Sequence, residues 1–159
     1  MTCPASAEEV AKRVTEIVED HAGREGPLLL ILHDVQETYG YVPGAAVKVI
    51  AEKLNLSRAE VHGVMSFYHD YREKPAGRHV IRLCRAEACQ SLGGERLADH
   101  ARKQLGLDWH ETSADGAVTL EPVFCLGLCA SAPAATVDGK LVARLDEDRL
   151  DAAIREVSA

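Results

Sequence analysis

The spacing of apolar residues changes at the polar segment of residues 71–77, and this change constrains the fold more than any other feature. Before it, apolar residues recur at helical spacing, as at Val10 and Val14. After it, alternating apolar residues and turn dipeptides indicate strands mixed with helices. Because Pro75 and Gly77 favour irregular backbone, we expect a linker here between two domains of different class.

Residues 1–75 are predicted to form four short helices with apolar stripes. Pro27 and Pro43 each stand where a helix begins, since proline lacks the N–H that a first turn leaves unused. Ser57 and Glu60 have the spacing of a capping box, which marks the start of the fourth helix. We therefore expect an N-terminal small helical bundle.

Residues 76–159 are predicted to form an α/β domain. The expected elements are, in order, strand 78–83, helix 94–105, strand 117–124, hairpin strands 134–137 and 141–145, and a helix after Asp146. Asp138 and Gly139 are the strongest hairpin signal. Pro122 interrupts its strand, which indicates a sheet edge or a bulge.

Four cysteines form two pairs with unequal gaps. Cys84 and Cys89 have four residues between them, and Cys125 and Cys129 have three. Each pair follows a predicted strand, so neighbouring strands would bring both loops to one rim of the sheet. Gly127 lies inside the second pair, where it would let backbone N–H groups approach sulfur.

This arrangement favours a [2Fe–2S] cluster, which needs four thiolates with two on each iron. Zinc remains an alternative as the ion of a zinc-stabilised interaction module, although zinc knuckles usually have two residues between ligands. A thiol–disulfide enzyme is disfavoured because the chain has no Cys-x-x-Cys motif. Cys3 stands apart from both pairs and is expected to be a bystander thiol.

Composition and charge narrow the class of protein. The net charge of −7 argues against a nucleic-acid partner. A local basic patch at Arg78, Arg82, Arg85 and Arg96 is as acceptable as scattered surface arginines. No apolar run approaches the roughly 18 residues that a membrane-spanning helix needs, and the N-terminus lacks the features of a signal peptide. We expect a cytoplasmic protein without direct membrane insertion.

Four segments resemble the thioredoxin-like [2Fe–2S] ferredoxin family, which includes the 24-kDa subunit of respiratory complex I. These segments are HDVQETYGYVP at 33–43, SFY at 66–68, CRAEAC at 84–89 and CLGLCASAP at 125–133. The resemblance implies a thioredoxin-like C-terminal domain. It also implies that Cys84, Cys89, Cys125 and Cys129 ligate the iron of one [2Fe–2S] cluster, and that the chain has no catalytic residue of its own.

The resemblance further implies a place in a larger oxidoreductase complex. The helical domain would dock onto a partner subunit that binds FMN, NAD and a [4Fe–4S] cluster. The segment CRAEACQSLGG most resembles the gamma subunit of NAD-dependent formate dehydrogenases, whose large subunit holds the molybdenum cofactor. Complex I (NADH-quinone oxidoreductase) and NAD-linked hydrogenases are the alternative parent complexes.

A few residues keep two interpretations. The segment 33–41 is either a docking surface or a helix whose Val35 and Tyr39 fill a core. Pro133 is either in a cis peptide, as is frequent in thioredoxin-like folds, or an ordinary loop proline. Trp109 has no evident functional partner and is expected in a core or an interface. His62 and His69 are not expected to bind metal.

Overall fold

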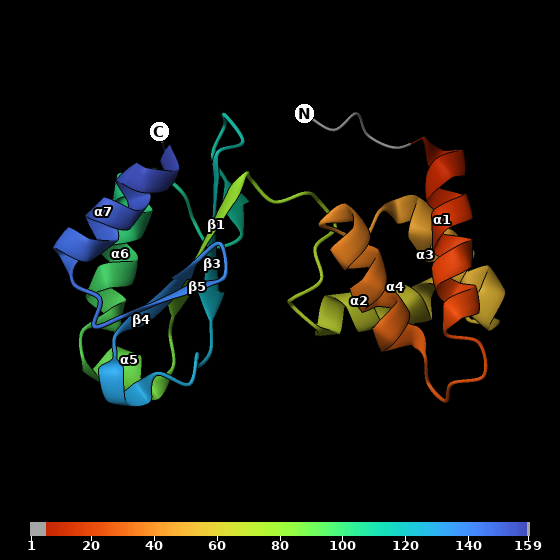
Figure 1. The fold of residues 1–159 in the computed structure, drawn as a ribbon, viewed down its shortest axis with the longest axis horizontal. Coiled ribbons are helices and arrows are strands. Elements are labelled where there is room, and N and C mark those ends of the chain that lie inside the picture. Colours follow the sequence, from red (N-terminus) through yellow and green to blue (C-terminus); the bar gives the residue numbers. More distant parts are fainter. Residues whose placement is uncertain (1–5, 159) are drawn as a thin grey trace. The chain divides into compact units, whose positions relative to one another are not determined.

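The computed structural model describes residues 6–158. The chain divides into two compact units, with the boundary between Pro75 and Ala76. Each unit has a hydrophobic core of its own. Figure 1 shows the elements of the two units.

The N-terminal unit is helical, as the apolar spacing predicts. Its helices are α1 (Ala7–Asp20), α2 (Leu28–Tyr39), α3 (Gly44–Leu54) and α4 (Arg58–Phe67). The capping box at Ser57 and Glu60 is present at the start of α4. Pro27 and Pro43 occupy the N-cap positions of α2 and α3, one residue before the expected place. Gly40 ends α2 in the left-handed conformation.

The core of the helical unit contains the apolar stripes of all four helices. Val14, Ile31, Ile50 and Val61 are fully buried, one from each helix. Helices this short are marginal alone, so their stability comes mainly from packing these stripes together.

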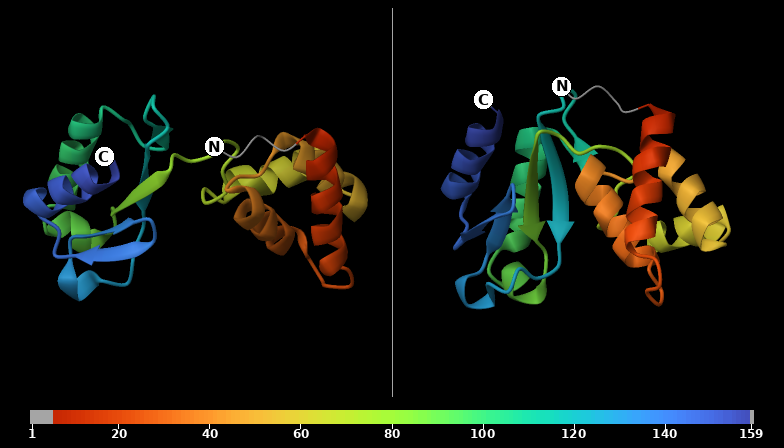
Figure 2. Two further views of the ribbon diagram at one scale, coloured as in Figure 1. Left: turned by 45° about the horizontal axis from the view of Figure 1, so that its top comes forward. Right: turned by 45° about the vertical axis from the view of Figure 1, so that its right-hand side comes forward.

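The C-terminal unit is a five-stranded mixed sheet with helices. Its elements are β1 (His79–Cys84), α5 (Glu87–Ser91), α6 (Gly94–Leu105), β2 (Glu111–Thr112), β3 (Val118–Val123), the 3₁₀ turn η1 (Cys129–Ser131), β4 (Ala134–Val137), β5 (Lys140–Ala143) and α7 (Glu147–Ser158). The strand order is β2-β3-β1-β4-β5; β1 and β3 are parallel, and the other neighbouring strands are antiparallel. Helices α6 and α7 lie side by side on one face of the sheet (Figures 1 and 2).

The core of this unit lies between that face and the two helices. Alternate residues of the central strands point into it, including Ile81 of β1 and Leu120 of β3. Leu97 of α6 and Ile154 of α7 pack against them. The alternation read from the sequence therefore identifies the buried face of the sheet.

Pro122 occupies a position that is open on one side. It pairs with Leu83 of β1, whereas β2 pairs with β3 only at Thr119 and Leu120. The missing N–H of proline therefore costs no ladder hydrogen bond toward β2. The strand itself lies inside the sheet, so the expectation of an edge holds for this stretch of β3 and not for the whole strand.

The hairpin forms where Asp138 and Gly139 predict it. Both residues have positive φ, 50° and 80°, as a two-residue turn with the twist of the strands requires. Three short elements were missed by the sequence analysis, namely α5, β2 and η1. They have five, two and three residues, too few to display a helical or strand period.

Candidate functional site

The four paired cysteines lie at one rim of the C-terminal unit. Because β1 and β3 are parallel neighbours, their carboxyl ends meet at the same edge, where Cys84 pairs with Val123. Cys84 is the last residue of β1, and Cys125 lies two residues beyond the end of β3. The topology therefore brings together the two loops that the sequence analysis placed at one rim.

The first cysteine pair is buried. Cys84 is 5% exposed and Cys89 is 3% exposed, and their side chains hydrogen bond to each other. Cys89 belongs to the short helix α5, whereas a loop was expected. Gly94 packs against the backbone of Cys89 so closely that a Cβ added there would lie 2.6 Å from the Cys89 carbonyl oxygen. The backbone around this pair is therefore tightly packed.

The second cysteine pair is exposed. The Sγ atoms of Cys125 and Cys129 are 3.7 Å apart. The backbone N–H of Gly127 donates to Cys125 Sγ at 3.4 Å. Gly127 has a φ of +74°, a conformation that glycine adopts without strain. This is the close approach of backbone to sulfur that the position of Gly127 predicts.

Backbone N–H groups from both loops point at the Cys84 sulfur. Burial is the largest single influence on the pKa of Cys84 and would raise it. Hydrogen bonds from the backbone of Ala86 in its own loop, and of Cys125 and Leu126 in the other loop, act in the opposite direction. With the bond from Cys89, they lower the pKa below that of an ordinary thiol. The site therefore favours a thiolate at this buried position.

The pKa values of Cys89 and Cys129 are raised, in contrast to that of Cys84. Burial, followed by the hydrogen bond to Cys84, raises the pKa of Cys89 to about 11. The hydrogen bond to Cys125 raises the pKa of Cys129. In both cases a neighbouring sulfur disfavours a further negative charge, which is the behaviour of thiols gathered to bind a cation.

The spacing of the sulfurs distinguishes a single metal ion from a larger cluster. A tetrahedral zinc ion with Zn–S bonds of about 2.3 Å would hold its four sulfurs roughly 3.8 Å from one another. Within residues 6–158, three possible metal-ligating side chains have ligand atoms within 4.8 Å of one another only at His33, Asp34 and Glu37. No three of the cysteine sulfurs in these residues lie that close together. The sulfurs thus form two pairs rather than one tetrahedron. Two pairs fit a [2Fe–2S] cluster, which takes two thiolates on each iron.

The arginines near the first pair do not form a basic patch. Arg82 pairs with Glu121, Arg85 with Glu95, and Arg96 with Glu147. Arg78 donates to the backbone oxygen of Asp115 at 3.4 Å. Each of these arginines therefore has a partner of its own, which favours separate arginines over one shared basic patch.

Several histidines pair with carboxylates. His62 contacts Glu73 at 3.0 Å, and the buried His21 bonds Asp34 at 2.7 Å. His21 holds the pKa of Asp34 below its usual range. Cys3 lies outside the described residues.

An exposed apolar surface on the helical unit was not expected from the sequence. Phe67 is 74% exposed, and its ring meets that of Tyr68, which in turn meets that of Tyr71. The Tyr71 hydroxyl donates to the backbone oxygen of Leu29, so the row of rings continues onto α2. We call Leu29, Leu30, Phe67, Tyr68 and Tyr71 the Phe67 surface. The motif SFY was the available signal, but helical spacing alone did not show that Phe67 and Tyr68 point outward.

Val35, Tyr39, Pro133 and Trp109 each take one of the places expected for them. Val35 is buried and Tyr39 packs against the core of the helical unit, so these two residues of the segment 33–41 are core residues. The peptide between Ala132 and Pro133 is cis. Trp109 is half-buried against the core of the C-terminal unit.

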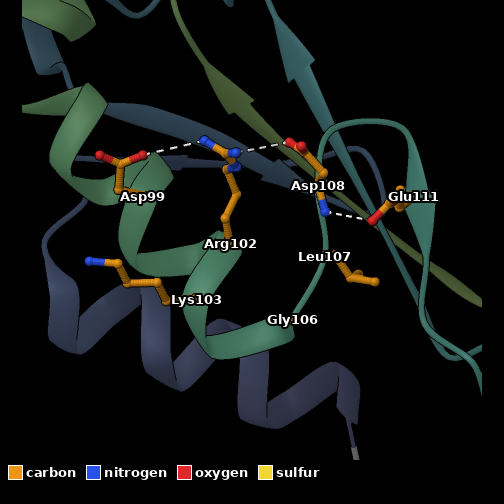
Figure 3. Close-up of a pocket in the computed structure, with 7 residues that line it drawn as sticks. All are labelled: Asp99, Arg102, Lys103, Gly106, Leu107, Asp108 and Glu111. Atoms are coloured by element: carbon orange, nitrogen blue, oxygen red, sulfur yellow. Dashed lines mark hydrogen bonds and ion pairs between the residues drawn. The ribbon is translucent and has the colours of Figure 1, made fainter.

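A polar pocket lies elsewhere on the C-terminal unit, at the carboxyl end of α6. It is lined by Asp99, Arg102, Lys103, Gly106, Leu107, Asp108 and Glu111 (Figure 3). Arg102 reaches both Asp99 and Asp108 across it. The pocket contains no cysteine, and its Arg102 is already paired with two of its carboxylates.

Among the described residues, no helix is long and apolar enough to cross a membrane.

Comparison with known proteins identifies the family of this chain. The pattern of the thioredoxin-like [2Fe-2S] ferredoxin family matches residues 14–158. A subunit of the NADH-quinone oxidoreductase of Pseudomonas aeruginosa is 42% identical over 104 residues, which are 65% of this chain and 63% of that protein. A subunit of the NADP-reducing hydrogenase of Solidesulfovibrio fructosivorans is 30% identical over 130 residues, 82% of this chain and 76% of that one.

A solved structure shows the same fold. A chain of an NAD+-reducing [NiFe]-hydrogenase superposes with a TM-score of 0.69 and 26% identity, over 83% of this chain and 23% of that chain. This chain thus covers less than two thirds of the Pseudomonas relative and about a quarter of the hydrogenase chain. The family pattern covers almost the whole length of the chain, and the mixed α/β architecture agrees with it. The chain belongs to the thioredoxin-like [2Fe-2S] ferredoxin family.

Proposed function

We propose that this chain is an electron-transfer subunit that holds one [2Fe–2S] cluster on Cys84, Cys89, Cys125 and Cys129. The observation that carries the proposal is the arrangement of the sulfurs as two pairs with backbone N–H groups directed at them. When bound, such a cluster supplies one-electron redox chemistry. The family to which the chain belongs implies the same cofactor.

The residues of the site have distinct tasks in this proposal. The four thiolates supply the negative charge that iron requires, and the N–H groups of Gly127, Cys125 and Leu126 stabilise that charge. The buried first pair keeps water from one side of the site. The exposed second pair leaves the other side accessible to a redox partner. The cysteines are free thiols in the described structure, which suits the reducing cytoplasm expected from the sequence.

Cluster binding is tested on the purified protein. We expect a red-brown protein with about two irons and two acid-labile sulfides per chain, and a paramagnetic signal after reduction. A colourless protein with one zinc ion would reject the proposal and support the zinc-stabilised interaction module instead.

The partner in this proposal is a flavin- and NAD-binding subunit of an oxidoreductase complex, with which the chain exchanges electrons. Relatives carry the names of NADH-quinone oxidoreductase and NADP-reducing hydrogenase subunits, which supports an NAD(P)-linked complex. In the hydrogenase structure the matched part is only 23% of one chain, so there a domain of this kind is joined to a much larger protein. This supports a large, permanent partner rather than a freely diffusing role.

Within that class, we favour a soluble formate dehydrogenase with a molybdenum-containing large subunit. The support is the segment between the first two cysteines, Arg85 to Ala88, which resembles that of the formate dehydrogenase gamma subunit. NADH-quinone oxidoreductase and NAD-linked hydrogenase are the alternatives. Affinity purification of the tagged chain from its native source tests the choice. Recovery of quinone-reductase or hydrogenase subunits in place of a molybdenum protein would reject the formate dehydrogenase assignment.

The helical unit is the part proposed to dock onto the flavin-bearing partner, through the Phe67 surface. Exposed aromatic side chains are frequent at the centre of protein interfaces and cost free energy when left in water. Leu29 and Leu30 of α2 are also exposed, at 39% and 44%. Apart from Tyr71, which also packs against the core, these side chains form an apolar surface that the core does not use.

Docking is tested by Phe67→Ser combined with Tyr68→Ser. We expect the doubly substituted protein to keep its cluster and lose its partner during purification. Leu141→Ser is the matched control, because Leu141 is 58% exposed on the C-terminal unit. Undiminished recovery of the partner with the double variant would show that another surface docks.

A further inference from the structure

Arg85 lies between two of the proposed ligands, and its side chain is fixed on several sides. Its guanidinium Nη2 donates to the Glu95 carboxylate, and its Cζ lies 5.2 Å from the centre of the Trp109 ring. The side chain is only 25% exposed. A surface arginine usually keeps its head group in water, so this burial indicates a specific role.

The backbone of Arg85 is held as firmly as its side chain. Its N–H donates to the Val123 carbonyl at 2.8 Å, which ties it to the end of β3. Its carbonyl accepts from the side chain of Gln90 at 2.7 Å. Arg85 is therefore attached both to the strand that leads to the second cysteine pair and to the helix that carries Cys89.

The ion pair with Glu95 closes a loop of residues 85–95, which contains Cys89 and begins directly after Cys84. Arg85 follows Cys84 directly, and Glu95 follows Gly94, whose backbone touches that of Cys89. Both cysteines thus lie in or next to a short closed segment. Closing a loop of this length reduces the conformations that its ligands sample.

The Trp109 ring connects Arg85 with Arg102, a residue that lines the polar pocket. Arg102 lies over the same ring, with its Cζ 6.0 Å from the centroid, and also pairs with Asp99 and Asp108. Figure 3 shows Arg102 between these two carboxylates. The indole is therefore held in place by a second cation, and it gives Arg85 a rigid surface to stack on.

We propose that Arg85 is a positioning residue that fixes the first cysteine pair, and that Arg85 and Glu95 together set the reduction potential of the site. This inference rests on the proposed cluster. Reduction adds one negative charge to a site that is already anionic. A partly buried cation on the residue that follows Cys84 favours the reduced state, and its carboxylate partner opposes it. The planar guanidinium alone can stack on Trp109 while it binds a carboxylate, so lysine would replace the charge and not the geometry.

Because Arg85 and Glu95 have opposite charges, removing one or the other is expected to shift the midpoint potential in opposite directions. Arg85→Gln removes the cation and leaves Glu95 without it, so the midpoint potential is expected to become more negative. Glu95→Gln removes the carboxylate and leaves Arg85 unopposed, so the potential is expected to become more positive. A purely structural role would not move the potential in opposite directions in the two variants.

Geometry is tested by Arg85→Lys and Trp109→Leu. Arg85→Lys is expected to restore the potential toward that of the unaltered protein. Both variants are expected to release iron to a chelator several-fold faster, because the loop that contains Cys89 and follows Cys84 is loosened. Arg96→Gln is the matched control, since Arg96 is a neighbouring arginine with 79% of its side chain exposed. It is expected to change neither the potential nor the release rate.

The outcomes separate this inference from the proposed function. If the unaltered protein contains no iron and sulfide, the proposed function fails. If it contains the cluster but the potentials of Arg85→Gln and Glu95→Gln shift together or do not shift, the electrostatic role of this pair is wrong. If chelation rates of Arg85→Lys and Trp109→Leu equal that of Arg96→Gln, the positioning role is wrong.

Discussion

The two cysteine pairs have the same residue type and nearly the same spacing, but different surroundings. Cys84 and Cys89 are buried in a strand end and a short helix, whereas Cys125 and Cys129 are exposed in a loop and a 3₁₀ turn. The first pair lies in packed structure, and the second is shaped by backbone with positive φ at Cys125 and Gly127. The difference shows that a site with four chemically equal ligands has a rigid half and an open half.

The largest expected effect is the loss of a ligand from either half. Cys84→Ala and Cys125→Ala are both expected to abolish cluster binding, as measured by iron and sulfide content. Only Cys84→Ala is expected also to destabilise the cluster-free protein, by roughly 1–2 kcal/mol in urea unfolding, because it leaves a cavity. Cys3→Ser is the control and is expected to keep the cluster. Full iron content in either alanine variant would contradict the ligand set.

The second prediction compares thiol reactivity in the cluster-free protein. Burial raises the pKa of Cys89 from 9.0 to about 11, so its thiolate fraction near neutral pH is lower by about 100-fold than that of an ordinary thiol. Its labelling rate is expected to rise about tenfold per pH unit until about pH 11, since only the thiolate reacts. Mass spectrometry after alkylation should find Cys125 modified first. Equal labelling of both pairs in the folded protein would remove the distinction between them.

The third prediction concerns the packing of the buried half. Gly94→Ala would place a Cβ 2.6 Å from the carbonyl oxygen of Cys89, so the backbone must shift. We expect a loss of about 1–3 kcal/mol in the free energy of unfolding. Cluster release to a chelator is expected to be faster as well. An unchanged unfolding midpoint would show that the buried half is not tightly packed.

The smallest expected effect concerns the open half. Gly127→Ala meets no atom within 4 Å, so its cost arises only from the φ of +74°. That cost is about 1 kcal/mol, measured by urea unfolding. The change also weakens the N–H bond to Cys125, so the reduction potential should shift while the cluster is retained. A larger destabilisation than that of Gly94→Ala would reverse the comparison of the two halves.

Much of the fold could be predicted from the sequence because its signals are local. Ser57 and Glu60 form their capping box, and Asp138 and Gly139 form the hairpin turn. Each depends on backbone geometry that one to four residues determine. The elements that were missed, such as α5, are too short to have a period.

The exposed Phe67 surface could not be predicted for a different reason. The pattern places Phe67 and Tyr68 at the end of α4, but which side of the helix end faces the core depends on how four helices pack. The same holds for the arginines near the first cysteine pair. Their carboxylate partners, such as Glu121 and Glu147, come from other elements of the unit, so sequence spacing does not reveal the ion pairs.

The sequence by itself determined that two cysteine pairs follow two strands, and that a helical domain precedes them, because spacing and turn chemistry are local properties. Only the tertiary structure decided that one pair is buried and the other exposed. Burial depends on what packs over each loop, and here Gly94 at the start of α6 packs on Cys89 while the loop at Gly127 remains open. The packing around the loops, rather than the cysteine spacing, makes the two halves of the site different.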